Sequence, residues 1–427
     1  MAKKDRGSWT ATRGSARSYG SHSSRGGFAL RRVVAGLVVL AILVVIAGVI
    51  QLLRPVPSPT FASSMSLPSV VAGQAPSIPW PLQGSATLDI QGIGSFGSHG
   101  SNTPIPIASV AKMTTALLII HDHPLQLGQS GPSITISQSD YQTYQQMLAA
   151  VDSVMAVAPG EVLNEYQLLQ ALLIPSADNI AITLANWDAG SVSAFVAKMN
   201  AFAKQLGLSG TTYTDPSGLT PTTVSTPKDQ LKIAELVEKN PVLAQIVSQP
   251  QATLPVAGTV YNVDYDLGHD GIVGVKTGST PNGGDFAFAA DVNVADGTTD
   301  KVVGVVLGQQ GLQPLITALD MGKTLVKSVA SVPKTVLVTK AGGVIGSVSV
   351  AGRGSIPVLS KSTVSAQEWP GLSQSSRYVF TLKKAPIKKG QVVGVMKIQV
   401  GEQHFTTELV AGASIGATPL SYRLTHL

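Results

Sequence analysis

The sequence predicts an α+β fold over residues 80–330, in which a block of helices is inserted between the strands of one antiparallel sheet. An alternating apolar run at residues 85–90 predicts the first strand, and similar runs return at residues 272–275, 286–294 and 301–307. Between them, the apolar side chains of residues 109–205 mostly follow helical spacing. Residues 331–427 contain short alternating runs separated by Gly, Lys and Pro turns, which predict a small all-β domain.

An apolar segment near the N-terminus predicts a transmembrane helix at residues 33–53. Residues 33–50 form an unbroken apolar run, which is long enough to cross a bilayer. Residues 1–32 hold eight lysines and arginines and one acid, so the positive-inside rule predicts a cytoplasmic tail there and an extracytoplasmic chain after Arg54. We therefore expect a single-pass protein of the cell membrane. The alternative is a secreted protein, cleaved near Ala62-Ser63-Ser64.

Composition excludes several classes of function. The chain of 427 residues has a net charge of +6, but this charge lies in the N-terminal tail and does not predict nucleic-acid binding. The absence of Cys excludes disulfides, thiolate metal sites and cysteine nucleophiles. No zinc-binding spacing such as His-Glu-x-x-His occurs, so we expect neither a metal nor a cofactor.

The remaining segments complete the predicted order. Residues 54–79 are rich in Pro and Ser and predict an extended linker between the membrane and the domain at residues 80–330. Helices are predicted at residues 168–174, from residue 180 onward, and at residues 199–206, 229–238 and 315–329. The last of these would lie on the sheet.

Three short motifs carry the chemistry. They occur in the order Ser109-Val110-Ala111-Lys112, Ser176-Ala177-Asp178-Asn179 and Lys276-Thr277-Gly278. Two further Ser-x-x-Lys strings, at Ser225 and Ser331, carry Pro between the Ser and the Lys, which disfavours one continuous helical face. Only the first string opens a long apolar run without Pro, where a spacing of three places Ser109 and Lys112 on the same helical face.

The first motif predicts a serine nucleophile and its base. A serine hydroxyl is a poor nucleophile until a base takes its proton, and Lys112 can be that base only as a neutral amine. Burial and a nearby cation both favour the neutral amine, and Lys276 is the predicted cation. The backbone amides of Ser109 and Ser279 are the predicted oxyanion donors.

The other two motifs predict substrate binding and proton relay. Lys276 and Thr277 would bind the terminal carboxylate of a substrate, and Gly278 would let the substrate backbone approach the strand. Ser176 would relay the proton to the leaving amine. Together the motifs predict an active-site-serine acyl-transfer enzyme.

These residues make the chain resemble the low-molecular-mass penicillin-binding proteins, specifically the D-alanyl-D-alanine carboxypeptidases of serine peptidase family S11. The resemblance covers about residues 80–330, through the three motifs and the strings Thr214-Asp215-Pro216-Ser217-Gly218-Leu219 and Ser225-Thr226-Pro227-Lys228-Asp229. It implies a penicillin-binding/β-lactamase-like transpeptidase fold and a C-terminal β-domain. It also implies an acyl-enzyme route, release of the terminal D-alanine from peptidoglycan stem peptides, covalent inhibition by β-lactams, and a role in cell-wall synthesis and cell shape.

The chain departs from the family in its second motif, which in the family is Ser-x-Asn. Here either Asp178 takes the Asn position or the turn is shifted so that Asn179 points inward. The family often anchors through a C-terminal amphipathic helix, and residues 421–427 do not resemble one, so the N-terminal span would take over that role. Two alternatives remain: a D,D-endopeptidase that cuts cross-links, and a catalytically silent wall-binding scaffold of the same fold.

Overall fold

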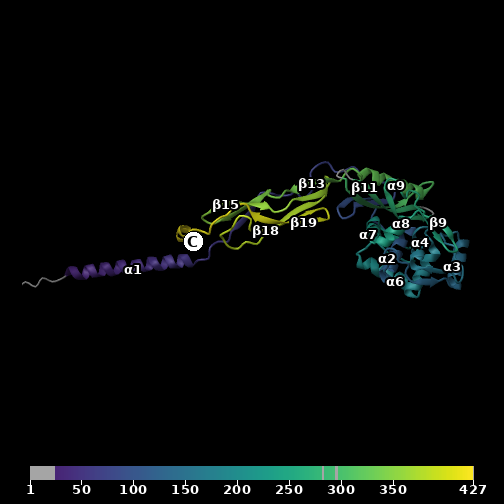
Figure 1. Ribbon diagram of the computed structural model, residues 1–427, viewed down its shortest axis with the longest axis horizontal. Coiled ribbons are helices and arrows are strands. Elements are labelled where there is room, and N and C mark those ends of the chain that lie inside the picture. Colours follow the sequence, from purple (N-terminus) through teal and green to yellow (C-terminus); the bar gives the residue numbers. More distant parts are fainter. Residues whose placement is uncertain (1–24, 281–282, 294–296, 427) are drawn as a thin grey trace, which may run out of the picture.

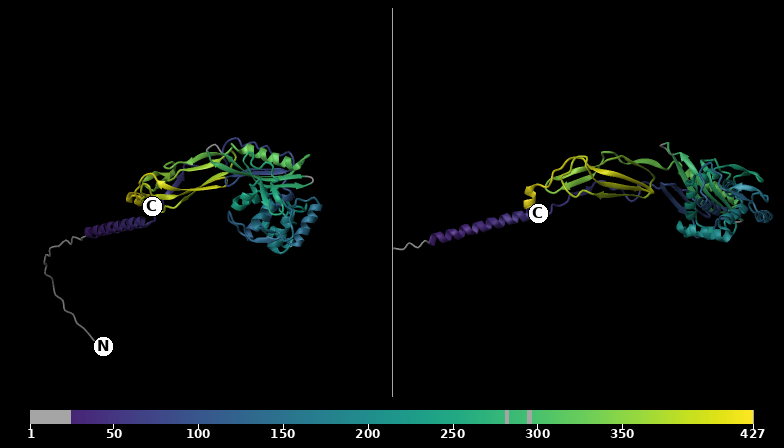
Figure 2. Two further views of the ribbon diagram at one scale, coloured as in Figure 1. Left: turned by 45° about the vertical axis from the view of Figure 1, so that its right-hand side comes forward. Right: turned by 60° about the horizontal axis from the view of Figure 1, so that its bottom comes forward.

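The computed structural model describes residues 25–280, 283–293 and 297–426. It is an elongated molecule with a long N-terminal helix at one end, a β-rich region in the middle and a mixed helix-and-sheet region at the other end (Figures 1 and 2). The first helix, α1, covers Arg25–Leu53 and thus begins before the predicted position. Of the tail predicted at residues 1–32, residues 1–24 lie outside the described residues, and residues 25–32 belong to α1. The predicted strand end at Val294 also lies outside the described residues.

The mixed region contains a five-stranded antiparallel sheet in the order β10-β11-β12-β2-β3. Its strands are β2 (Ser85–Ile90), β3 (Gly94–His99), β10 (Ile272–Thr280), β11 (Gly283–Asn293) and β12 (Thr299–Gln309). The predicted α+β fold is therefore confirmed, because β2 pairs with β12, a strand that follows about 210 residues later, beyond the helices.

Helices cover both faces of this sheet. Strand β11 alternates between the two faces: Phe286 and Phe288 pack with α9 (Pro314–Val329), and Ala287 and Ala289 pack with the helical block. The block comprises α2 (Lys112–Asp122), α3 (Gln138–Ala149), α4 (Glu165–Leu173), α5 (Asp178–Ala189), α6 (Val192–Gln205), α7 (Pro227–Lys239) and α8 (Pro241–Val247). It is not all helical, since the short strands β5 (Ser133–Thr135) and β6 (Val162–Asn164) pair within it.

Two further two-stranded sheets belong to the mixed region. Strand β4 (Ile105–Pro106), just before the first motif, pairs with β7 (Val224–Ser225), and β8 (Gln251–Leu254) pairs with β9 (Gly258–Tyr261). The first pairing matters for the site, because it joins the start of α2 to the loop that precedes α7.

The β-rich region is a six-stranded sheet in the order β1-β14-β15-β19-β18-β17, with the pair β13 and β16 beside it. The C-terminal strands are β13 (Lys334–Thr339), β14 (Val344–Val350), β15 (Gly354–Ser360), β16 (Val364–Glu368), β17 (Gln374–Phe380), β18 (Val392–Val400) and β19 (Gln403–Ala411). Strand β1 (Thr60–Ser63) belongs to the predicted linker but pairs antiparallel with β14. Much of residues 54–79 therefore runs along this sheet.

The chain ends in a short helix, α10 (Leu420–His426), where the sequence resembled no amphipathic helix. This helix contacts the end of α1, and the Arg423 guanidinium donates to the carbonyl oxygen of Leu52. The C-terminal end of α1 and the helix α10 therefore meet beside the six-stranded sheet (Figure 1).

Candidate active site

Ser109 lies in a 3₁₀ turn, Ala108–Ala111, that leads directly into α2. The flanking Val110 and Ala111 are fully buried, which fixes the turn in the core. The Lys112 Nζ donates to the Ser109 Oγ at 2.7 Å. The predicted spacing of three thus brings the nucleophile and its base into direct contact.

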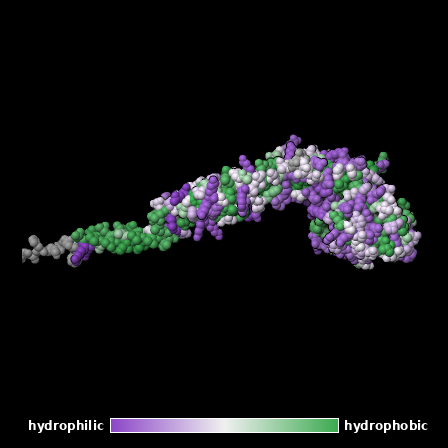
Figure 3. Space-filling model, viewed as in Figure 1, coloured by the Kyte–Doolittle hydropathy of each residue, from purple (hydrophilic) through white to green (hydrophobic). Residues whose placement is uncertain are grey.

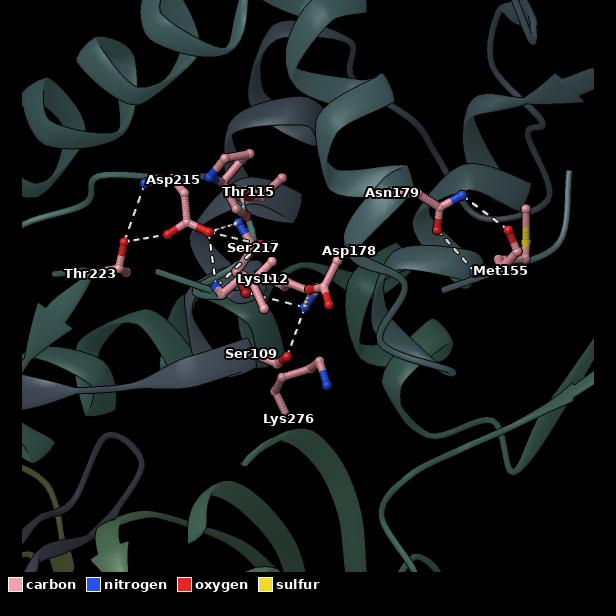
Figure 4. Close-up of polar contacts among 12 residues, drawn as sticks. Ser109, Lys112, Thr115, Met155, Asp178, Asn179, Asp215, Ser217, Thr223 and Lys276 are labelled. Atoms are coloured by element: carbon pink, nitrogen blue, oxygen red, sulfur yellow. Dashed lines mark hydrogen bonds and ion pairs between the residues drawn. The ribbon is translucent and has the colours of Figure 1, made fainter. Parts of the chain in front are cut away.

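The Lys112 amine is completely buried and has two further acceptors. It donates to the Asp178 Oδ1 at 2.6 Å and to the Ser217 carbonyl oxygen at 3.1 Å, as Figure 4 shows. An ammonium group has three donors, so these three acceptors match its charged form. To take the proton of Ser109, Lys112 must first give one of its own protons away.

The second motif directs the side chains of its neighbouring residues Asp178 and Asn179 to different places. Asp178 opens α5 and points at Lys112, whereas the Asn179 amide exchanges two hydrogen bonds of 3.0 Å with the backbone of Met155 (Figure 4). Of the two arrangements left open by the sequence, the structure has Asp178 in the cluster. Asn179 instead holds the chain that precedes β6.

Ser176 is buried two residues before α5, in the left-handed backbone region with φ +63°. Its Oγ accepts from and donates to no described residue. A buried hydroxyl without a partner costs free energy, so this one is held in place by the turn rather than by its own bond. It is free to contact a substrate or a water molecule.

Strand β10 carries the third motif at the edge of the five-stranded sheet and packs against the turn of Ser109. Lys276 is only 2% exposed, and its Nζ donates to the Thr277 carbonyl oxygen at 3.1 Å. Burial, and next the charge of Lys112, hold the pKa of Lys276 well below its usual value, although the carboxylates of Asp178 and Asp264 oppose them. Without a bound anion the Lys276 amine is thus driven toward neutrality, which differs from the expectation that it keeps its charge.

The rest of the third motif has mixed surroundings. Thr277 is buried, and Ser279 is exposed and lines a surface hollow with Tyr265. A Cβ on Gly278 would lie 2.9 Å from the Ile107 carbonyl oxygen and 3.1 Å from the Asp285 Cβ. The absence of a side chain at Gly278 therefore allows the backbone of Ile107 and the side chain of Asp285 to pack closely against β10. The sequence had suggested a different reason for this glycine, namely close approach of the substrate backbone. The predicted amide donors, of Ser109 and Ser279, belong to elements that pack together.

The sequence analysis gave no role to the loop at residues 215–219, which the structure brings to Lys112. The Asp215 carboxylate accepts from the Ser217 Oγ at 2.8 Å and from the Leu219 N–H at 2.9 Å, and the Thr115 Oγ1 donates to the Pro216 carbonyl oxygen at 2.6 Å. These bonds orient the Ser217 carbonyl toward Lys112. The string Asp-Pro-Ser-Gly was the one sequence signal for this loop. It could not indicate the contact with Lys112, because a backbone carbonyl is the same in every residue type.

Asp264 is a second residue without a predicted site role. Its carboxyl group lies in the loop before β10, where it acts on the charge of Lys276 and has one oxygen without a partner among the described residues. Burial raises the pKa of Asp264 to about 6. Among the described residues, no group of three or more His, Cys, Asp or Glu could hold a metal.

Comparison with known proteins identifies the family. The family model for D-alanyl-D-alanine carboxypeptidases (peptidase S11) matches residues 97–311, which contain all three motifs. The D-alanyl-D-alanine carboxypeptidase DacB2 of Mycobacterium tuberculosis is 32% identical over 216 residues, covering 49% of this chain and 70% of that protein. A D-alanyl-D-alanine endopeptidase of Pseudomonas aeruginosa is 30% identical over 211 residues, covering 48% of this chain and 65% of that protein.

A solved structure extends the likeness beyond the mixed region. Penicillin-binding protein 5 of Haemophilus influenzae aligns with a TM-score of 0.57 and 20% identity, covering 81% of this chain and 100% of that one. At this identity the likeness is one of fold. With the family model covering half of the chain and the motifs in place, the protein belongs to the D-alanyl-D-alanine carboxypeptidase family of serine peptidases.

Proposed function

We propose that the protein is a serine-type D-alanyl-D-alanine carboxypeptidase that removes the terminal D-alanine from peptidoglycan stem peptides and binds penicillin covalently. The observation that carries this proposal is the contact of 2.7 Å between the buried Lys112 Nζ and the Ser109 Oγ, next to the strand β10 that carries the buried Lys276. Family membership supports the same reaction. The reaction needs no cofactor or metal.

The residues act in two steps. In the first, Ser109 attacks the carbonyl carbon of the last peptide bond while the neutral amine of Lys112 takes its proton. The proton passes through Ser176 to the departing amine, so that D-alanine leaves and an ester remains on Ser109. In the second step a water molecule attacks this ester, and Lys112 takes and returns a proton once more.

Substrate binding falls to the third motif. Lys276 and Thr277 would hold the terminal carboxylate, and Asp178 and Ser279 would border the peptide. A bound carboxylate would favour the charged form of Lys276, so the substrate would supply the counter-charge that this buried amine lacks. Asn179 contributes by fixing the backbone around Met155 rather than by touching the substrate.

Mass spectrometry of the intact full-length chain in detergent, mixed with a penicillin, tests the proposal. We expect one covalent adduct on the parent chain and none on Ser109→Ala. The matched control is Ser331→Ala, which removes an exposed serine from another Ser-x-x-Lys string and should keep the adduct. A folded parent chain without an adduct would favour the catalytically silent scaffold.

An endopeptidase is the second candidate, because the Pseudomonas aeruginosa relative carries that name. Both activities use the same three motifs. Product analysis on linear and cross-linked muropeptides separates them: released D-alanine marks the carboxypeptidase, and separated cross-linked dimers mark the endopeptidase.

We further propose that α1 anchors the protein in the cell membrane, with the rest of the chain outside the cytoplasm. Residues 33–50 of α1 are an unbroken apolar run that the rest of the protein leaves exposed, with a mean hydropathy of 3.3 over the best window of the helix, and basic residues precede the run. Cleavage near Ala62 would cut inside β1, where Ala62 pairs with Ser347. Resistance of the protein to carbonate extraction, together with protease accessibility in spheroplasts, tests both points.

The same arrangement supports the proposed division of the chain. A cytoplasmic tail at residues 1–32, a span at 33–53 and a connecting segment at 54–79 would be followed by the catalytic domain at 80–330 and the β-rich domain at 331–427. The connecting segment would form part of the β-rich domain through β1 rather than act as a free spacer. Limited proteolysis should then spare residues near Thr60 in the folded protein.

A further inference from the structure

The end of the six-stranded sheet next to α1 gathers positive charge. The loop from β17 to β18 carries Lys383, Lys384, Lys388 and Lys389, all exposed, and the turn from β14 to β15 carries the exposed Arg353. We call these five residues the α1-proximal basic cluster. Among the described residues, no carboxylate forms an ion pair with the four lysines.

Hydrogen bonds place this cluster at the end of α1. The Lys389 N–H donates to the Ser414 Oγ at 2.9 Å, and the Arg353 Nε donates to the Ala417 carbonyl oxygen at 2.9 Å. Both acceptors lie in the segment that leads into α10, which contacts α1. The loop, the turn and the end of α1 therefore share one end of the sheet.

The chain segments at this end also lack acids. Residues 54–59, 351–356, 380–392 and 411–426 hold seven lysines and arginines and no Asp or Glu. A solvated surface normally mixes the two signs, so a surface of one sign predicts an oppositely charged partner. Figure 3 shows polar side chains projecting from the β-rich region close to the apolar surface of α1.

We propose that the α1-proximal basic cluster docks on the anionic phospholipid headgroups of the bilayer that α1 enters. The continuity with α1 favours lipid over any other anion, because a spanning α1 would hold the cluster at headgroup level. In α10, Leu420 and Leu424 are exposed and lie four residues apart, so they share one helix face beside α1 and can enter the interface. Docking would fix the angle between the elongated molecule and the membrane.

The proposal rests on the proposed anchoring by α1, but not on the proposed peptidase activity. Basic side chains near an anionic surface each add to the attraction, and salt screens it. Docking should therefore depend on the lipid charge, on the four lysines and on the ionic strength, whereas insertion of α1 should not.

The absence of Cys allows a single fluorescent probe to test this. Ala417→Cys on the full-length chain, labelled with an environment-sensitive dye, is placed in nanodiscs that contain headgroup spin-labelled lipid and either zwitterionic or partly anionic phospholipid. We expect stronger quenching, by roughly two-fold or more, in the anionic discs, and its loss in high salt. Equal quenching in the two kinds of disc would overturn the proposal.

Two charge variants complete the experiment. Gln at Lys383, Lys384, Lys388 and Lys389 should abolish the gain in anionic discs, whereas Gln at Lys204, Lys228, Lys232 and Lys340, four exposed lysines elsewhere, should preserve it. Co-purification with the discs reports insertion separately. If a soluble polyphosphate binds through the four lysines but anionic lipid changes nothing, the cluster is a phosphate-polymer site and the lipid proposal is wrong.

Discussion

Lys112 and Asp178 form a buried ion pair, with the Nζ 2.6 Å from the Oδ1, inside the site that must generate a neutral lysine. A carboxylate favours the ammonium form of a neighbouring amine, which is not the basic form. The same carboxylate compensates the charge of an amine that no water reaches. Asp178 therefore stabilises the resting site but disfavours the neutral form of Lys112 that acts as the base.

We predict that Asp178→Asn raises the rate of penicillin acylation at neutral pH, on the order of ten-fold, because the variant removes a negative charge from the Nζ that must accept the proton of Ser109 and give it up again. Stopped-flow acylation at neutral pH measures this rate.

Asp152→Asn is the matched control for this variant. It removes the same charge from a residue that senses Asp178 and Lys112 electrostatically but contacts neither. A change as large as that of Asp178→Asn would mean that general charge, and not the buried pair, controls the base.

Binding of a substrate that ends in a carboxylate should depend on the charge of Lys276. Because burial and Lys112 lower the pKa of Lys276, its charge and hence its affinity for a carboxylate should be lost at a pH below the ordinary lysine value of 10.5. We expect the KM for a peptide with a free terminal carboxylate to rise through that pH, while the KM for the matching C-terminal amide stays flat.

Lys276→Met tests the same point without a titration. This change should remove the preference for the free carboxylate over the amide, mainly through KM. If the variant retains the preference, the carboxylate is bound by another group.

The sequence predicted those parts of the fold that depend on local pattern. The strands β10, β11 and β12 and the helices α7 and α9 were expected close to their observed positions, because their apolar spacing is regular. Strand β1 was not, because four residues in a Pro-rich stretch carry no pattern and their partner, β14, is almost 300 residues away. Its place as an edge strand tolerates the nearby prolines.

In the site, too, local features were predicted from the sequence and features that depend on distant residues were not. The contact of Ser109 with Lys112 followed from their spacing of three residues, which is local, although Ser109 lies in the 3₁₀ turn that precedes α2. The choice between Asp178 and Asn179 did not, because it depends on the amide of Asn179 bonding to the backbone of Met155, 24 residues earlier. The contact of Ser217 with Lys112 could not be predicted either, because it is made by the backbone carbonyl of Ser217, which every residue type has.

Gly218 is predicted to be essential for the turn of Ser109. Its φ is +81°, and a Cβ would lie 1.7 Å from the Ala108 carbonyl oxygen, so Gly218→Ala must displace the nucleophile or the Ser217 carbonyl. Gly160 has the same φ but open space around its Cβ position. Gly160→Ala should therefore cost only the backbone strain of about 1 kcal/mol.

Penicillin labelling of both glycine variants, after thermal melting has verified that they fold, decides the matter. We expect Gly218→Ala to lose at least about ten-fold in labelling rate and Gly160→Ala to label like the parent. Equal rates for the two would show that the close approach to Ala108 is not needed for acylation.

The last prediction concerns Asp285, which faces Gly278 across the β10–β11 ladder. Burial raises the pKa of Asp285 to about 7, against one opposing bond from the Gly308 N–H. The folded carboxyl keeps its proton between pH 3.8 and 7, where the unfolded one has released it. The free energy of unfolding therefore falls as the pH rises through this window, and the loss is complete above pH 7.

Asp285→Asn removes this loss because an amide does not titrate, while its oxygen can still accept from Gly308. The variant should match the parent in stability near pH 4 and exceed it at pH 8 by up to about 4 kcal/mol. Thermal melting in detergent at both pH values measures the difference. Asp291→Asn, on the same strand but half exposed, should lack this pH-dependent gain, and a similar gain there would refute burial as its cause.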